Sequence, residues 1–307
     1  MIKRILRKLG VSRPPFKLDD QSRASLDALR QELSELSQKV ESIRVHTWID
    51  KEAGILAAQD VALMTAPRYA DPRCLTPHQV QMFSQNGEDG IITEVFRRIG
   101  VGDRYFVEIG AGDGIENNTR LLLQIGWRGV WIEADSNQAR HIRERYPEEL
   151  ADGRLILIES SVTAENISKL LIDAGVAKRF DFLSMDIDMN TGHVWRAMLE
   201  AGFAPRVACV EYNASGPPSV DWQEPYDAQG RWEDGSNYFG AGLKMLENIG
   251  RAGGMSLVGC EYLGNNAFFV ADGDRGEHFL PPYTAEQHYE PPRYCLLNHR
   301  GHRKQPR

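Results

Sequence analysis

Short apolar runs alternate along residues 105–270 with segments in which apolar side chains recur every three or four positions. Short apolar runs bounded by glycine or polar residues are typical of strands, and apolar residues at helical spacing are typical of amphipathic helices. The pattern predicts strands over 105–109, 130–133, 155–158, 182–187, 207–212, 255–260 and 267–270. It predicts helices over 84–99, 116–125, 136–146, 163–174, 194–199 and 238–251, with Ser84, Ser136 and Thr163 as expected N-caps.

The order of these elements predicts the fold class. Five strand–helix units with short connections favour a parallel, doubly wound α/β sheet with right-handed crossovers. The last two strands surround Leu263-Gly264-Asn265 and are expected to form a hairpin that adds one antiparallel strand. A mostly parallel, seven-stranded sheet is therefore expected, and at 307 residues the chain has room for one such domain plus appendages.

The first nine residues, MIKRILRKL, place apolar side chains on one helical face and basic side chains on the other. This pattern is typical of a helix that lies on an anionic membrane, and a frayed basic terminus explains it equally well. Each basic residue near such a surface contributes only about 1 kcal/mol, so contact through residues 1–12 would be weak and reversible.

Apolar residues then repeat every seven positions. The two positions of this seam are occupied by Leu26, Leu29, Leu33, Leu36, Val40 and Ile43. Three heptads indicate a short coiled coil, which would join copies of the chain into a homo-oligomer through residues 26–43. Packing of the helix on its own domain is the alternative, and the flanking charges leave the partner and its orientation unspecified.

Pro67, Pro72 and Pro77 indicate a linker between the helical segment and the α/β domain. No internal repeat or low-complexity tract interrupts the chain. The expected division is a basic amphipathic arm over 1–17, a helical segment over 18–65, a linker over 66–80, the α/β domain over 81–272 and a tail over 273–307.

Composition and charge narrow the classes of function. An apolar content of 42% and a charged content of 26% are ordinary for a soluble globular protein. The net charge is −7, and the segments 1–17 and 291–307 carry basic side chains without any acid, so the body between them is more acidic still. An acidic body argues against nucleic acid as a partner, because phosphate neutralisation dominates such binding.

The cellular compartment follows from what the sequence lacks. The four cysteines are scattered without a C-x-x-C pair, the apolar runs are shorter than a membrane span, and no secretory signal is visible. We therefore expect a cytoplasmic protein, peripheral at the inner face of the membrane if the basic arm binds there.

The most informative stretch is FVEIGAGDG, residues 106–114, in which an apolar strand runs into three glycines. Glycines suit a tight turn where the backbone approaches a ligand closely. Their spacing, G-x-G-x-G, differs from the dinucleotide fingerprint G-x-G-x-x-G. Glu108, Asp113 and Glu116 lie in or beside the turn, where repulsion between like charges makes a poor cradle for phosphate. They suit a cationic or hydroxyl-rich ligand such as S-adenosylmethionine, which carries a sulfonium, an ammonium and a ribose but no phosphate.

Ligands of doubly wound sheets bind at the carboxyl ends of the strands. Glu133 ends the second strand nineteen residues after Gly114, a distance at which a carboxylate takes ribose hydroxyls. Ser160 and Ser161 follow the third strand, near where an adenine would lie, and Glu211 ends the fifth. Polar side chains at each of these ends predict a ligand site.

The fourth strand ends in DIDMN, residues 186–190. An EF-hand loop is excluded because the glycine and glutamate that it needs at its sixth and twelfth positions are missing. Strand alternation would put Asp186 and Asp188 on one side, where two carboxylates require either a divalent cation or a shared proton. Either arrangement would orient or deprotonate a hydroxyl, and His193 in the next helix is the other candidate base.

Six segments taken together resemble the FkbM-type branch of class I S-adenosylmethionine-dependent methyltransferases. They are SQNGEDGII (84–92), FVEIGAGDGIENNT (106–119), GWRGVWIEAD (126–135), LSMDIDMNTG (183–192), PRVACVEYN (205–213) and NAFFV (266–270). The resemblance covers roughly residues 80–272 and implies a Rossmann-like fold with S-adenosyl-L-methionine as the cofactor. The donor-binding residues expected on this basis are Glu108, Gly110, Gly112, Gly114, Asn118, Glu133, Ser161 and Asp186.

Members of this family often methylate sugar hydroxyls in glycolipids, surface polysaccharides and natural products, so the resemblance implies O-methylation of a carbohydrate or glycolipid acceptor. Many members resemble D-x-E-G at the end of strand four, whereas this chain has Asp186-Ile187-Asp188-Met189, which keeps the acids but loses the glycine. The expected catalytic residues are Asp186, Asp188 and His193, and the two aspartates are also the candidate ligands of a divalent cation. Candidate stacking surfaces for a sugar are Trp222, Tyr226, Trp232 and Tyr238.

Two other functions stay open at this point. An NAD-dependent oxidoreductase is disfavoured by the glycine spacing and by the acids in the turn. A non-catalytic module that binds S-adenosylmethionine would use the coiled coil and the basic arm to recruit a partner enzyme of glycan assembly.

Overall fold

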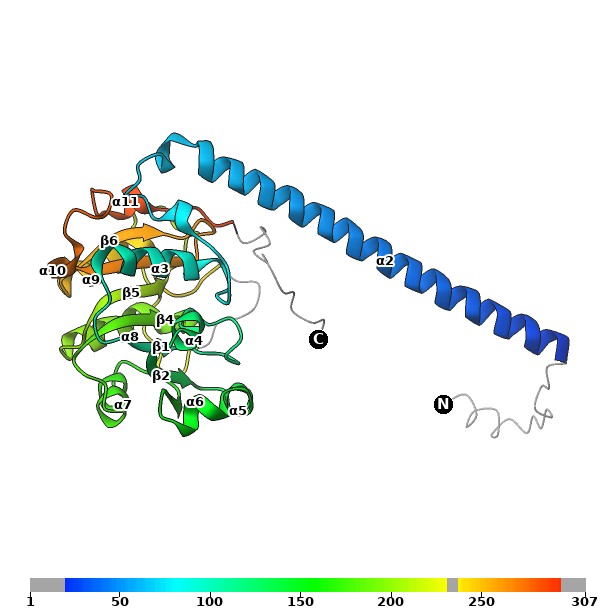
Figure 1. Cartoon of the computed structure of the whole chain (residues 1–307), viewed down its shortest axis with the longest axis horizontal. Helices are drawn as coiled ribbons and strands as arrows, with labels where there is room; N and C mark the ends of the chain where they lie inside the picture. Colours follow the sequence, from blue (N-terminus) through cyan, green and yellow to red (C-terminus); the bar gives the residue numbers. More distant parts are fainter. Residues whose placement is uncertain (1–19, 231–236, 294–307) are drawn as a thin grey trace. The chain divides into compact units, whose positions relative to one another are not determined.

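The computed structural model of the chain describes residues 20–230 and 237–293 (Figure 1). Two compact units are distinguished, Met1–Gly54 and Ile55–Arg307. One long helix, α2 (Asp20–Thr65), accounts for the described part of the first unit, and the α/β domain belongs to the second. The predicted basic arm over 1–17 lies outside the described residues, so its membrane contact stays a prediction. Within the described ranges, no helix combines the length and apolar character needed to span a membrane.

Seven strands form one sheet in the order β3-β2-β1-β4-β5-β7-β6. The strands are β1 (Tyr105–Ile109), β2 (Arg128–Glu133), β3 (Leu155–Glu159), β4 (Arg179–Met185), β5 (Ala204–Glu211), β6 (Met255–Cys260) and β7 (Asn266–Ala271). The first five pair in parallel, and β7 is antiparallel to both β5 and β6. The predicted sheet and its terminal hairpin are therefore confirmed, with β7 lying between β5 and β6.

Helices cover both faces of the sheet, which makes the fold doubly wound (Figure 1). The α-helices of this unit are α3 (Glu88–Ile99), α4 (Arg120–Gln124), α5 (Ser136–Arg145), α6 (Pro147–Ala151), α7 (Ile167–Asp173), α8 (Thr191–Glu200), α9 (Leu243–Ala252), α10 (Asp272–Arg275) and α11 (Ala285–His288). Side chains of α3, α4 and α5 pack into one apolar core, and those of α7, α8 and α9 pack into another. The adjacent strand residues Phe106 and Val107 belong to different cores, as the two-residue period of a strand requires.

The helix α4 begins at Arg120 rather than at the predicted residue 116, because a buried carboxylate holds the preceding segment in a turn. Glu108 accepts hydrogen bonds from the backbone N–H groups of Asn118 (3.0 Å) and Thr119 (3.3 Å) and from the Thr119 hydroxyl (2.5 Å). A side-chain carboxylate of β1 thus accepts hydrogen bonds from the backbone N–H groups that come just before α4.

Other helix boundaries differ from the prediction for similar reasons. Ser84 is not an N-cap, because Asp89 binds the backbone N–H groups of residues 82–84 and α3 starts only at Glu88. Asp135, not Ser136, caps α5. Pro147 begins α6, since proline is well tolerated in the first turn of a helix. Both α7 and α9 begin later than predicted.

The segment predicted as a linker, 66–80, packs against the α/β domain over part of its length. Tyr69 and Leu75 are buried. The Tyr69 hydroxyl donates a hydrogen bond to Glu290 in the C-terminal tail (2.9 Å), and Leu75 lies against Gly259 of β6. The prolines of this segment therefore accompany turns on the domain surface.

Candidate functional site

Two cavities lie at the carboxyl ends of the parallel strands, the edge on which this topology places ligand sites. The larger has a volume of about 770 Å³ and is bordered by the ends of β1, β2, β3 and β4. The sequence-predicted residues that line it are Gly110, Gly112, Glu133, Ser161, Asp186 and Asp188.

The smaller cavity, of about 580 Å³, lies between the glycine turn, the segment before α3 and the start of β7. Its lining includes Glu88, Glu108, Asn118, Ser184 and Asn266. Gly110, Gly112 and Asp186 line both cavities, so the cavities meet at these three residues. Among the described residues, neither lining includes a lysine, arginine or histidine.

The three glycines of the turn have different surroundings. Gly110 has φ +86°, and a Cβ there would collide with the carbonyl oxygen of Asp186, so the two backbones are in direct contact. Gly112 has φ +57°, and a Cβ there would meet no atom within 4 Å, because it would enter the cavities. Gly114 lines neither cavity, and its missing Cβ makes room for the ring of Tyr146 instead.

Glu133 is anchored at the end of β2 by two backbone groups. Its Oε2 accepts a hydrogen bond from the N–H of Gly112 (2.7 Å), and its Oε1 accepts one from the N–H of Asp135 (2.8 Å). Each carboxylate oxygen can accept a second hydrogen bond. Glu133 is thus a fixed acceptor for two hydroxyl groups at the wall of the larger cavity, with Ser161 at the neighbouring strand end.

Glu108 is buried and forms part of the wall of the smaller cavity. Burial raises its pKa to about 7, although hydrogen bonds from Thr119 and Asn117 favour the charged form. Asn118, held by Glu108 through its backbone, donates from its side chain to the Ser184 hydroxyl (3.0 Å). Glu108 therefore fixes the geometry of this wall.

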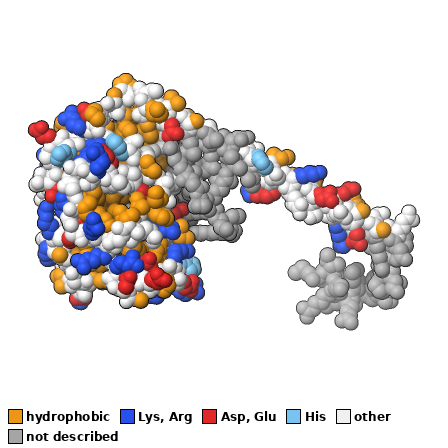
Figure 2. All heavy atoms as spheres, viewed as in Figure 1, with side chains coloured by type: hydrophobic (Ala, Val, Ile, Leu, Met, Phe, Trp, Pro, Cys, Tyr) orange, Lys and Arg blue, Asp and Glu red, His pale blue; other side chains and the backbone are white. Residues whose placement is uncertain are grey.

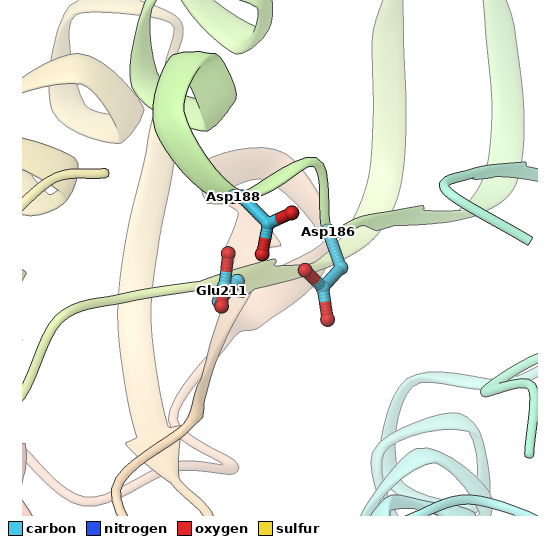
Figure 3. Close-up of side chains that lie close together, drawn as sticks. All are labelled: Asp186, Asp188 and Glu211. Atoms are coloured by element: carbon cyan, nitrogen blue, oxygen red, sulfur yellow. The ribbon is translucent and has the colours of Figure 1, made fainter. Parts of the chain in front are cut away.

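Asp186 and Asp188 lie beyond β4, which ends at Met185, and Asp188 has φ +57°. The two carboxylates do come together, as predicted. The predicted reason, alternation along a strand, is wrong, because both residues lie outside β4. Figure 3 shows them beside a third carboxylate, that of Glu211 at the end of β5. One oxygen from each of the three lies within 4.8 Å of the other two.

Surrounding protein and mutual repulsion shift the pKa values of this cluster. Desolvation raises the pKa of Asp186 to about 6, and the charges of Asp188 and Glu88 act in the same direction. The pKa of Glu211 lies well above its usual range because of its burial and its two aspartate neighbours. Asp186 stays reachable through both cavities, and the buried Oε2 of Glu211 has no hydrogen-bond partner within the described residues. The cluster therefore suits a cation or a shared proton.

The position of His193 is a correction to the predicted site. His193 lies in α8 and lines neither cavity. Its Nε2 lies 2.8 Å from the carbonyl oxygen of Glu224, and its ring packs against Tyr226 at 5.3 Å. A carbonyl only accepts hydrogen bonds, so Nε2 carries the proton. The geometry does not support His193 as the base.

Three of the four predicted aromatic side chains line neither cavity. Trp222 and Tyr238 pack edge to face on each other, with ring centroids 5.3 Å apart. The Tyr226 hydroxyl donates to Glu165 (2.5 Å). None of these three lines either cavity, and Trp232 lies outside the described residues.

Two residues of the smaller cavity were missed by the analysis of the sequence. Glu88 is buried and accepts a hydrogen bond from the side-chain amide of Asn266 (2.7 Å). The Oδ1 atom of Asn266 is buried and has no partner in the part of the chain that the structure describes. The sequence feature that could have revealed them is a polar residue at the start of an apolar element. Such residues open the helix in SQNGEDGII and the strand in NAFFV.

No protein-family model matches the chain, and no curated protein matches it. Solved structures with a similar fold do match it. The N-terminal domain of EvdMO1 with SAH bound is 13% identical over 65% of this chain and 90% of that chain, with a TM-score of 0.40. The METTL16 MTase domain is 13% identical, over 60% and 66% of the two chains, with a TM-score of 0.39. The O-methyltransferase from Bacillus cereus in complex with SAH is 17% identical, over 54% and 67%, with a TM-score of 0.34.

Each of these TM-scores lies below 0.5, so the fold assignment rests on the strand order rather than on these likenesses. The order β3-β2-β1-β4-β5-β7-β6, with only β7 antiparallel, is the topology of the class I methyltransferase fold. The fold that the resemblance implied is therefore present in this chain.

Proposed function

We propose that this protein is an S-adenosylmethionine-dependent O-methyltransferase that acts on a hydroxyl group of a carbohydrate or glycolipid. The observation that carries the proposal is the junction of two cavities at Gly110, Gly112 and Asp186. A methyl transfer needs a donor and an acceptor side by side, and two adjoining cavities with a carboxylate at their junction offer that arrangement.

The larger cavity fits the nucleoside part of the donor. Glu133 would present a fixed carboxylate to ribose hydroxyls, and Ser161, two residues beyond β3, lines the same cavity where an adenine is expected. The open space in front of Gly112 admits a ligand close to the backbone. A dinucleotide fits less well, because the acidic linings lack a basic side chain within the described residues to balance its pyrophosphate.

The smaller cavity fits the methionine part of the donor and the acceptor hydroxyl. Glu108 and Asp186 supply negative charge that attracts the ammonium and the sulfonium. When no cation is bound, Asp186, with a pKa of about 6, is suited to take the proton from the acceptor hydroxyl near neutral pH. Most of the expected acceleration comes from alignment of donor and acceptor, because methyl transfer from a sulfonium requires no covalent intermediate with the protein.

Asp186, Asp188 and Glu211 also fit a divalent cation, since three carboxylate oxygens are the hard ligands that Mg²⁺, Mn²⁺ and Ca²⁺ prefer. The unpartnered Oε2 of Glu211 supports this fit. A bound cation would supply Lewis-acid polarisation of the acceptor hydroxyl.

EDTA should therefore lower turnover while leaving the affinity for S-adenosylhomocysteine largely unchanged, and added Mg²⁺ or Mn²⁺ should restore turnover. A radiometric methyl-transfer assay and calorimetry measure the two quantities. The variant Glu211→Gln should show lower turnover, and EDTA should not lower that turnover further. Equal turnover with and without EDTA would mean that the carboxylates share a proton instead.

The proposed function is tested in two steps. Calorimetry should detect S-adenosylhomocysteine binding and no comparable binding of NAD, and the reverse preference would reject the proposal in favour of an oxidoreductase. Mass spectrometry of surface glycans from cells with and without the gene should then reveal species that differ by the mass of one methylene group. Donor binding without any such difference would favour a non-catalytic module.

A further inference from the structure

A line of apolar side chains is exposed along α2, and we call it the α2 seam. The exposed fractions are 38% for Leu26, 64% for Leu29, 72% for Leu33, 59% for Leu36, 57% for Val40 and 65% for Ile43. Figure 2 shows hydrophobic side chains interspersed with charged ones on this helix. A helix draws most of its stability in water from packing of an apolar face, so we expect the α2 seam to pack against a partner.

We propose that two copies of the chain associate through residues 26–43 as an antiparallel coiled coil. The seam residues take heptad positions a (26, 33, 40) and d (29, 36, 43). In a coiled coil the flanking positions e and g set the orientation of the partner. Here position g holds Ser25, Glu32 and Lys39, and position e holds Arg23, Arg30, Ser37 and Arg44.

A parallel pair is disfavoured by these flanking residues. In that orientation each g position faces the e position five residues further along the other copy. Lys39 would then face Arg44 of the second copy, twice by symmetry, and the two like charges would repel. Glu32 would face the neutral Ser37, so no attraction offsets the repulsion.

An antiparallel pair gives Glu32 and Lys39 partners of opposite charge. Here g faces g, and in the register that sets Leu26 beside Ile43 of the second copy, Glu32 faces Lys39. The twofold symmetry repeats this ion pair, and all six apolar positions are covered. A shift by one heptad in either direction would set Glu32 against itself or Lys39 against itself. The Glu32–Lys39 ion pairs therefore favour this orientation and this register.

In this register position e faces e, which sets Arg30 near the neutral Ser37 and Arg44 near Arg23 of the second copy, so one like-charged pair at each end of the seam opposes the arrangement. Arg30 and Arg44 form ion pairs on their own helix, with Asp27 (3.2 Å) and Glu41 (2.8 Å). The next seam positions on either side, Ser22 and Thr47, are polar, so the apolar contact is confined to three heptads. A contact this short predicts reversible, concentration-dependent dimerisation.

Sedimentation velocity of the full-length chain between about 1 and 200 µM tests the proposal. We expect a monomer–dimer equilibrium that Leu33→Glu with Leu36→Glu abolishes. Glu32→Lys should weaken the dimer about fivefold to tenfold, because two attractions become two repulsions. Glu35→Lys is the matched control. It makes the same charge change at heptad position c, which faces away from the seam, and it should leave the equilibrium unchanged.

Lys39→Glu separates the two orientations. The antiparallel pair predicts a weaker dimer for this variant, whereas the parallel pair predicts a tighter one, because the introduced carboxylate would attract Arg44 of the second copy. The double variant Glu32→Lys with Lys39→Glu should restore wild-type association only in the antiparallel pair. A tighter dimer for Lys39→Glu, no rescue in the double variant, a trimer or tetramer, or a monomer at every concentration would each overturn the proposal.

Discussion

Asp186→Asn should lower the rate of methyl transfer by about 10²–10⁴-fold. The variant should change the affinity for S-adenosylhomocysteine by less than about tenfold. Asp186 lines both cavities, so its carboxylate lies where donor and acceptor are proposed to meet. Asparagine keeps the size of the side chain but neither accepts a proton near neutral pH nor binds a cation as a carboxylate does. Single-turnover methyl transfer and calorimetry measure the two effects separately.

Two further variants make the Asp186 result interpretable. Asp188→Asn should lose less activity, because Asp188 lines only the larger cavity. Its φ of +57° is tolerated by asparagine, so backbone strain does not confound the comparison. Asp173→Asn removes an exposed carboxylate at the end of α7 that lines neither cavity, and its turnover should stay near wild type. Near-normal turnover in Asp186→Asn, or a parallel loss of donor binding, would contradict the role proposed for Asp186.

The strands were predictable because buried parallel strands are continuous apolar runs with sharp ends. The predicted strands over 105–109 and 255–260 coincide with β1 and β6. Helix starts were less predictable because tertiary contacts decide them. The carboxylate of Glu108, on β1, delays the start of α4, and no local pattern around residue 116 reveals that contact.

Site residues that lie at the end of one strand could be predicted from the sequence. Site residues that are brought together by the pairing of two strands could not. Glu133 and Asp186 follow from the rule that ligands bind at the carboxyl ends of parallel strands. The insertion of β7 next to β5 sets Asn266 opposite Glu211, and that pairing joins residues far apart in the sequence. The prediction that His193 lies at the site was wrong. A short helical turn at residues 188–190 comes before α8, and the His193 ring packs on Tyr226 instead of facing a cavity.

Gly112→Val should weaken the binding of S-adenosylhomocysteine by at least about a hundredfold, because a branched side chain would occupy the space through which the ligand approaches the backbone. A Cβ at Gly112 meets no protein atom within 4 Å, so the variant fills the cavity rather than the core. The positive φ of +57° also strains valine, at a cost of about 1–2 kcal/mol or more in the free energy of unfolding. Calorimetry measures the binding, and urea denaturation measures the stability.

Gly175→Val separates the two effects of the Gly112 substitution. Gly175 also has a positive φ, +71°, and open space around its missing Cβ, but it follows α7 and lines neither cavity. The strain on valine is therefore similar at both positions, and the two variants should lose comparable stability. Only Gly112→Val should lose the ligand. Tight binding by Gly112→Val would exclude the glycine turn from the donor site, and an equal loss of binding in Gly175→Val would attribute the effect to destabilisation of the fold.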